Sequence, residues 1–132
     1  MKGFEPVTLT WRGASFTVKA EDQLRLIAEI EDALSDSKGT PAVLSLMRPG
    51  GPGYARLSAA YGAALRYAGA DVTDQDIYLS INEELSEGDP TAAIRMQNAI
   101  IGLLAIVSPP AYRRLMMEDA EDTMGKPQGE GR

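Results

Sequence analysis

The sequence contains no cysteine and no histidine. The first absence excludes a disulfide, a thiolate metal ligand and a thiol nucleophile. The second removes the side chain that most often serves as general base or metal ligand in enzymes. Catalysis would then need Asp and Glu ligands for a hard metal, or an activated lysine such as Lys19 or Lys38. We therefore predict a non-enzymatic protein without a cofactor or metal, and we retain a small carboxylate-metal enzyme as a remote alternative.

Positive charge and long apolar runs are also scarce. Thirteen Lys and Arg residues against nineteen Asp and Glu residues leave a formal charge of −6, which opposes binding to nucleic-acid phosphates. The longest apolar run, AIIGLLAIV, is far shorter than the roughly 20 residues that span a bilayer. The N-terminal letters MKGFEP contain no apolar signal segment. We expect a cytoplasmic protein whose partners are other proteins, with no nucleic acid and no membrane among them.

The most apolar stretch of the chain, DPTAAIRMQNAIIGLLAIVSPP, predicts a core helix over residues 90–107. Asp89 is a suitable N-cap, and Pro90 suits the first helical position, where no N–H group is needed. Two further prolines, Pro109 and Pro110, should end the helix. Because IIGLLAIV is apolar on every side, we expect other elements to surround the helix there.

Residues 7–18, VTLTWRGASFTV, alternate apolar and polar side chains about a central Arg12-Gly13 pair, which is typical of a β-hairpin. Pairing across that turn places six apolar side chains on one face: Val7, Leu9, Trp11, Ala14, Phe16 and Val18. A lone hairpin is marginal in water, so this face should dock on helices or join a partner's sheet. Either arrangement should bury Trp11, as a core residue or, alternatively, as an interface anchor.

Four further helices are predicted from apolar residues at helical spacing. They cover residues 20–34, 41–47 and 54–68 and a segment that begins near residue 74. Thr73 and Asp76 form a variant of the capping box at the start of the last of these helices. Its buried line is expected to be Ile77, Ile81 and Leu85.

The predicted fold is α+β and mostly helical. An N-terminal hairpin is followed by about five helices, which pack around the apolar C-terminal helix at residues 90–107. Residues 1–110 should form a single domain, and residues 111–132 a short helix, a disordered tail or both.

Two features, one face of the helix at 54–68 and the loop before it, suggest contacts with other elements. Small residues form one face of the helix at 54–68, so the helix at 90–107 or a neighbouring subunit can approach it closely. The loop from Arg48 to Gly53, RPGGPG, should be irregular, and it lacks the Lys-Ser/Thr pair of a phosphate-binding loop. A loop that orders on a partner is one hypothesis for it.

The order of these parts resembles the small tail assembly chaperones of long-tailed phages, within the branch found in gene transfer agents and related prophages. The segments that carry the resemblance are RLIAEIEDAL, after the hairpin, and ALRYAGADVTDQDI, between the third and fourth helices. The resemblance covers about Val7 to Val107. It does not extend to the RPGGPG loop or to the tail after Pro110.

The resemblance implies a chaperone that binds the apolar helices of a tape measure protein and helps to recruit tail tube subunits. We expect such a protein to self-associate as a homo-oligomer. The predicted partner-binding residues are two around the loop and three apolar side chains beyond the core helices: Arg48, Tyr54, Tyr112, Leu115 and Met116. A structural tail or connector subunit that stays in the particle is the alternative function.

Overall fold

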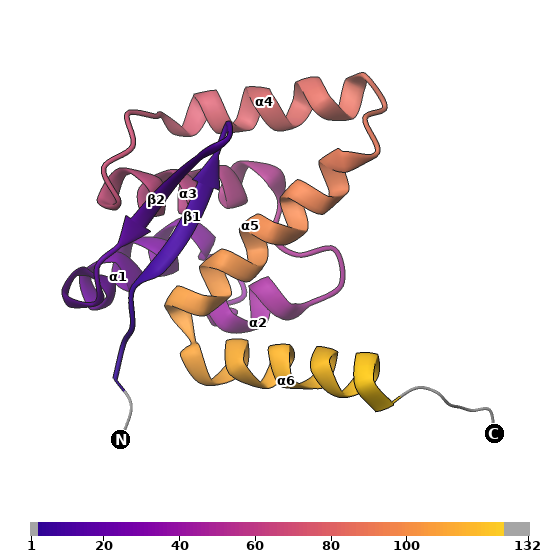
Figure 1. The fold of residues 1–132 in the computed structure, drawn as a ribbon. Helices are drawn as coiled ribbons and strands as arrows, with labels where there is room; N and C mark the ends of the chain where they lie inside the picture. The colour runs from indigo at the N-terminus through magenta and orange to yellow at the C-terminus, as the bar shows by residue number, and fades with distance from the viewer. Residues whose placement is uncertain (1–2, 126–132) are drawn as a thin grey trace.

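The computed structural model describes residues 3–125, with side chains described as far as residue 118. In Figure 1 an N-terminal hairpin lies against a group of helices. The elements in chain order are β1 (Val7–Trp11), β2 (Ala14–Val18), a 3-10 turn (Ala20–Asp22), α1 (Gln23–Leu34), α2 (Ala42–Met47), α3 (Tyr54–Tyr67), α4 (Asp74–Ser86), α5 (Thr91–Val107) and α6 (Pro109–Gly125). The predicted fold class, α+β and mostly helical, is confirmed.

The hairpin has the predicted register in all five residue pairs. Arg12 and Gly13 both have positive φ, 50° and 81°, as the tight turn of a twisted hairpin requires. Leu9 and Val18 are buried as expected, but Trp11 is only half-buried. Trp11 lies next to the turn, where the Arg12 guanidinium sits 5.1 Å from the centre of its ring and takes the place of a core neighbour.

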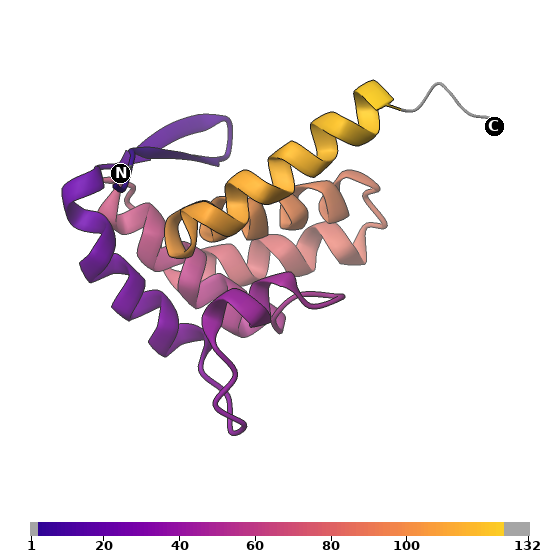
Figure 2. The same ribbon diagram turned by 90° about the horizontal axis from the view of Figure 1, so that it is seen from below.

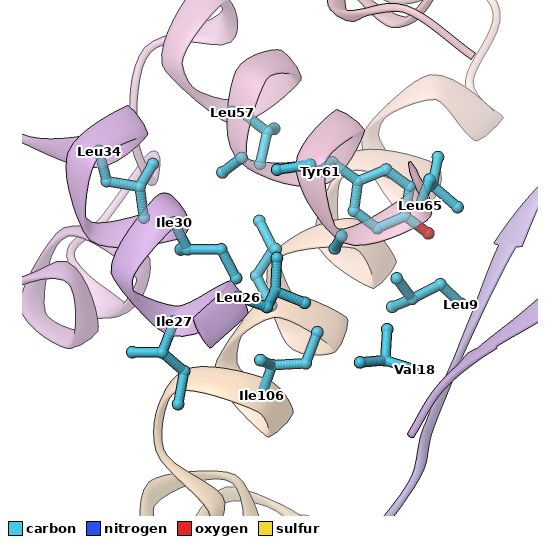
Figure 3. Close-up of a cluster of buried hydrophobic side chains, with 14 of the residues drawn as sticks. Leu9, Val18, Leu26, Ile27, Ile30, Leu34, Leu57, Tyr61, Leu65 and Ile106 are labelled. Atoms are coloured by element: carbon cyan, nitrogen blue, oxygen red, sulfur yellow. The ribbon is translucent and has the colours of Figure 1, made fainter. Parts of the chain in front are cut away.

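The core lies where the hairpin, α1, α3 and the C-terminal half of α5 meet. Figure 3 shows side chains from these elements pointing toward one another. The fully enclosed residues include one from each element: Val18, Leu26, Leu65 and Ile106. The hairpin therefore buries its apolar face on helices of its own chain.

Two residues on the helices position the hairpin. The Tyr61 hydroxyl on α3 donates a hydrogen bond to the Thr10 carbonyl at 2.8 Å and accepts one from the Thr10 N–H at 3.3 Å. Burial raises the pKa of Tyr61, so this hydroxyl keeps its proton and remains a donor. On α5, Gly102 leaves room for β1, because a Cβ there would lie 2.8 Å from Leu9 Cδ2.

α3 is the most enclosed helix among the described elements. Eight of its fourteen residues are buried, and it packs most extensively against α1 and then α4. Its small residues explain this close packing, since Gly62 has the Asp74 carboxylate of α4 where a side chain would otherwise lie. α5, which was the neighbour predicted for α3 within the chain, packs against α3 less extensively than α1 and α4 do.

α4 begins with the predicted capping box. The Thr73 hydroxyl accepts from the Asp76 N–H and the Asp76 carboxylate accepts from the Thr73 N–H, each at 3.0 Å. Ile77 is buried and Ile81 half-buried, but Leu85 is exposed, so the predicted buried line is wrong at its end. α4 runs antiparallel to α3 and extends past the N-terminal end of α3, so α3 does not cover the last turn of α4 (Figure 1).

α5 begins at Thr91, one residue later than predicted. The N-cap position is occupied by Pro90, and Asp89, the predicted cap, lies one residue before it, where its carboxylate accepts from the Thr91 N–H and hydroxyl at 2.9 and 2.7 Å. Leu103 and Ile106 are fully enclosed, but five of the eight residues from 100 to 107 are only half-buried. The first half of the helix is mostly exposed. The prediction that other elements surround residues 100–107 on every side is therefore wrong, because they cover this segment only in part.

The chain turns sharply after α5 and continues as α6, with Ser108 as the single residue between the two helices. The Ser108 carbonyl accepts from the Tyr112 N–H at 2.9 Å, and its Oγ accepts from the Ala111 N–H at 3.3 Å. The two prolines end α5 as predicted, but they also form the first turn of α6, where their missing N–H groups leave no hydrogen bond unmade. α6, at 17 residues, is thus longer than the short helix that was predicted. The rest of the predicted tail, residues 126–132, lies outside the described residues.

Candidate functional site

A groove of about 480 Å³ runs along one side of α5. The end of α2, the loop that follows it and the start of α3 form one wall, and Leu115 of α6 also lines the groove. These elements can be followed in Figure 1. We call it the α5 groove. One face of α5 forms its floor: Ala93, Met96, Gln97, Ile100, Ile101 and Leu104.

The floor has the dimensions of a helix-binding surface. Its residues recur at intervals of three and four, as residues on one face of a helix must. From Ala93 to Leu104 the face is about 16 Å long, at about 1.5 Å per residue. All of its residues except Gln97 are apolar. Leu104 at the inner end is only 2% exposed, so about two turns of a second helix, over Ala93 to Ile101, match the accessible part of the floor.

The loop from residue 48 to 53 is held against α5 by its glycines. Gly50 and Gly51 both have positive φ, 83° and 65°. A Cβ on Gly51 would come within 2.8 Å of Ile100 Cδ1, so the backbone itself touches α5. Arg48 closes the turn, since its carbonyl accepts from the Gly51 N–H at 2.9 Å and its Nε donates to the Gly51 carbonyl at 3.3 Å. The loop therefore has a defined path without a partner.

The structure brings three of the five predicted partner-binding residues together, because Arg48, Tyr54 and Leu115 all line the α5 groove. Tyr112 lies elsewhere on α6, in a depression beside β1. Tyr112 and Leu115 lie on α6, outside the predicted core helices, but both also pack against the core. The physical reason is that α6 folds back against α5. Met116 is half-buried and is not among the residues that line the groove.

The floor of the groove was not predicted, because the apolar sequence of α5 suggested a helix covered on all sides. The signal that could have revealed it is the polar content of the first half of the helix. Arg95, Gln97 and Asn98 interrupt the apolar run and mark that half as accessible to water.

The groove differs in charge from the chain as a whole. Arg48 is the one charged residue among those that line it, although the protein is acidic overall. Two large apolar side chains that line it have much of their surface exposed, namely Met47 at 53% and Tyr54 at 42%. The result is an apolar surface that carries a single basic group.

The other side of α5 is more polar. A second depression, of about 580 Å³, lies between the hairpin turn, α4 and α5. Arg95 on this side forms an ion pair with Glu84 and a longer one with Asp89 at 3.8 Å. These charged groups hold α4 to α5 by pairing with each other, so the α5 groove is the better candidate for a partner.

The acidic groups with shifted pKa values serve the fold. Hydrogen bonds from neighbouring threonines lower the pKa of Asp36, Asp76 and Asp89, and all three carboxylates cap a turn or a helix. None of them lines the α5 groove. Across the part of the chain that the structure describes, no three acidic side chains gather where a metal ion could be held. In the same part, none of the helices has both the length and the apolar character that crossing a membrane requires.

Comparison of the chain with protein-family models, with curated proteins and with solved structures found no match.

Proposed function

We propose that this protein is a non-enzymatic assembly chaperone that holds an apolar helix of its partner in the α5 groove. The observation that carries the proposal is the apolar floor from Ala93 to Leu104, beside a wall formed by the loop between α2 and α3. Helix-in-groove recognition uses such a surface, because apolar side chains at intervals of three and four on the partner enter a groove of matching length. The lack of cysteine and histidine supports a binding role over a catalytic one.

The particular partner we propose is the tape measure protein of a long-tailed phage or gene transfer agent, with tail tube subunits recruited afterwards. This choice rests on the resemblance carried by RLIAEIEDAL and ALRYAGADVTDQDI. A tape measure protein is long, helical and apolar, and such a chain needs its surface covered before assembly. The α5 groove is suited to cover a helix of that kind.

The position of Arg48 adds a condition on the partner. A partner helix should carry an Asp or Glu beside its apolar stripe, where it meets the guanidinium at the wall of the groove. Charge pairs at the border of an interface contribute mainly to specificity and association rate. Arg48→Glu should therefore slow association more than it speeds dissociation.

Co-expression with the tape measure protein of the same gene cluster tests the proposal. The tape measure protein should stay in solution and copurify with the tagged chaperone. Ala93→Glu places a carboxylate on the apolar floor at an exposed position, so it should weaken the complex about tenfold or more without unfolding the chain.

Ala28→Glu is the matched control, because Ala28 is also an exposed helical alanine but lies on α1, outside the groove. It should leave binding unchanged. An insoluble tape measure protein with no recoverable complex would refute the chaperone function. Equal binding by both variants would instead place the contact somewhere other than the α5 groove.

A further inference from the structure

The outward side of α6 carries a face that the described fold does not use. Five residues line a shallow depression of about 440 Å³ on it: Pro110, Arg113, Arg114, Met117 and Glu118. They recur at the spacing of a single helical face. Met117, at the middle, is 63% exposed. A different face of the helix packs Tyr112 and Leu115 against the core, so α6 has one face for its own fold and another that is free.

The basic residues of α6 precede its acidic residues, which is the unfavourable order for an isolated helix. Arg113 and Arg114 lie in its first half, and the letters EDAED, residues 118–122, lie in its second half. The helix macrodipole favours the reverse, with acidic residues near the N-terminus and basic residues near the C-terminus. An arginine placed four residues before a glutamate is likewise the weaker order for a pair on a helix surface. A neighbouring helix of opposite direction would convert this unfavourable order into a favourable one.

We propose that α6 pairs in antiparallel orientation with the α6 of a second copy of this chain, about a twofold axis at Met117. The basic half of each helix then lies beside the acidic half of the other, and the two macrodipoles oppose each other. At about 1.5 Å per residue, Arg114 of one copy and Glu118 of the second lie about 3 Å apart along the shared axis.

The position of α6 in the molecule leaves space for this partner. Figures 1 and 2 both show the C-terminal half of α6 extending away from the other helices. A second α6 can lie along it without displacing the hairpin or α4. The paired face also differs from the face that lines the α5 groove through Leu115, so both copies keep their grooves open. The pairing does not depend on the proposed function.

Sedimentation of the full-length protein over a range of concentrations tests the pairing. A reversible dimer should form, and it should weaken as salt screens the charged halves. Met117→Asp places two carboxylates at the axis and should raise the dissociation constant about tenfold or more. Leu79→Asp is the control, because Leu79 is exposed to a similar degree, 55%, but lies on α4. It should leave the dissociation constant unchanged.

A charge exchange tests the direction of pairing. Arg113→Glu with Arg114→Glu makes one variant acidic along α6, and Glu118→Arg with Glu121→Arg makes another more basic. Each should be monomeric alone, and an equimolar mixture should form the dimer. Circular dichroism of each variant shows whether α6 remains helical before mixing.

Three results would overturn the pairing: a wild-type monomer at every concentration, a Met117→Asp dimer as tight as wild type, or a mixture that stays monomeric. Co-expression with the tape measure protein gives an independent result, since a complex can form there whether or not α6 pairs. The two proposals therefore succeed or fail separately.

Discussion

α3 and α5 show opposite relations between composition and burial. α3 is rich in alanine and glycine, yet eight of its fourteen residues are buried, whereas α5 has the most apolar sequence and only four of seventeen. Small side chains let α1 and α4 approach α3 closely, while the larger side chains of the first half of α5 have neighbours on fewer sides. Burial is thus decided by neighbours more than by hydrophobicity. The apolar surface of α5 exceeds what the fold covers, and the excess forms the floor of the groove.

The largest expected effect comes from shortening one large apolar side chain on each helix. Leu65 on α3 is fully buried, so Leu65→Ala should lower the free energy of unfolding by about 3 kcal/mol through lost contacts and a cavity. Ile94 on α5 is 60% exposed, so Ile94→Ala should change it by less than about 0.5 kcal/mol. Denaturant unfolding measures both. Similar losses would mean that α5 is covered as fully as α3.

Replacing Gly102 on α5 and Gly62 on α3 by alanine, in separate variants, should give a smaller difference in the free energy of unfolding. Alanine gains about 1 kcal/mol over glycine within a helix. At Gly102 that gain is opposed by a clash with Leu9, which is buried and has little room to move, and overpacking costs about 1–3 kcal/mol. Gly102→Ala should therefore lower the free energy of unfolding by about 1 kcal/mol, as the difference between these terms.

At Gly62 the new methyl group would meet the Asp74 carboxylate, the exposed end of a side chain that can turn away. The substitution loses at most the surface ion pair between Asp74 and Arg66, worth about 0–1 kcal/mol. Gly62→Ala should thus be near neutral, and thermal unfolding of both variants measures the contrast. A larger loss at Gly62 than at Gly102 would show that α4 meets α3 more tightly than the hairpin meets α5.

The smallest effect concerns the helix cap beside α3. Hydrogen bonds from Thr73 lower the pKa of Asp76 below its ordinary value of 3.8. A carboxyl group with a lower pKa in the folded state stabilises the fold above its unfolded pKa, and this contribution is lost as pH falls through the folded pKa. The stability difference between wild type and Asp76→Asn should therefore be constant from about pH 7 to about pH 5 and shrink toward about pH 2.

Denaturant unfolding at a series of pH values measures that difference. Thr73→Ala removes the hydroxyl, the smaller of the two Thr73 contributions that lower the pKa of Asp76, and keeps the backbone N–H that donates to its carboxylate. In that background the dependence on pH should therefore be smaller but still present. A difference that grows as the pH falls would contradict the assigned role of Asp76.

Sequence patterns predicted the features that depend on nearby residues. The hairpin register follows from alternation about Arg12-Gly13, and the start of α4 follows from Thr73 and Asp76, three residues apart. In both cases the interacting groups lie within a dozen positions of each other. Local backbone geometry is enough to bring such groups together, and no knowledge of the tertiary fold is needed.

The α5 groove was predictable only in part. Arg48 and Tyr54 were predicted as partner-binding residues because they border a loop rich in glycine and proline. Which side of α5 stays open depends on where α6 goes, and one residue, Ser108 with φ −146° and ψ 83°, sets that direction. Neither this conformation nor the contact of Gly51 with Ile100 can be read from spacing. Both follow from the packing of elements that lie far apart in the sequence.

The corner at Ser108 also bears on the thermodynamics of any ligand that enters between the two long helices. Pro109 and Pro110 have φ fixed by their rings, and a single serine completes the link. Two of the torsions at the corner between α5 and α6 are thus restrained by covalent bonds before the ligand arrives. Little conformational entropy remains to be lost on docking, so this pre-organisation favours affinity without adding a single contact.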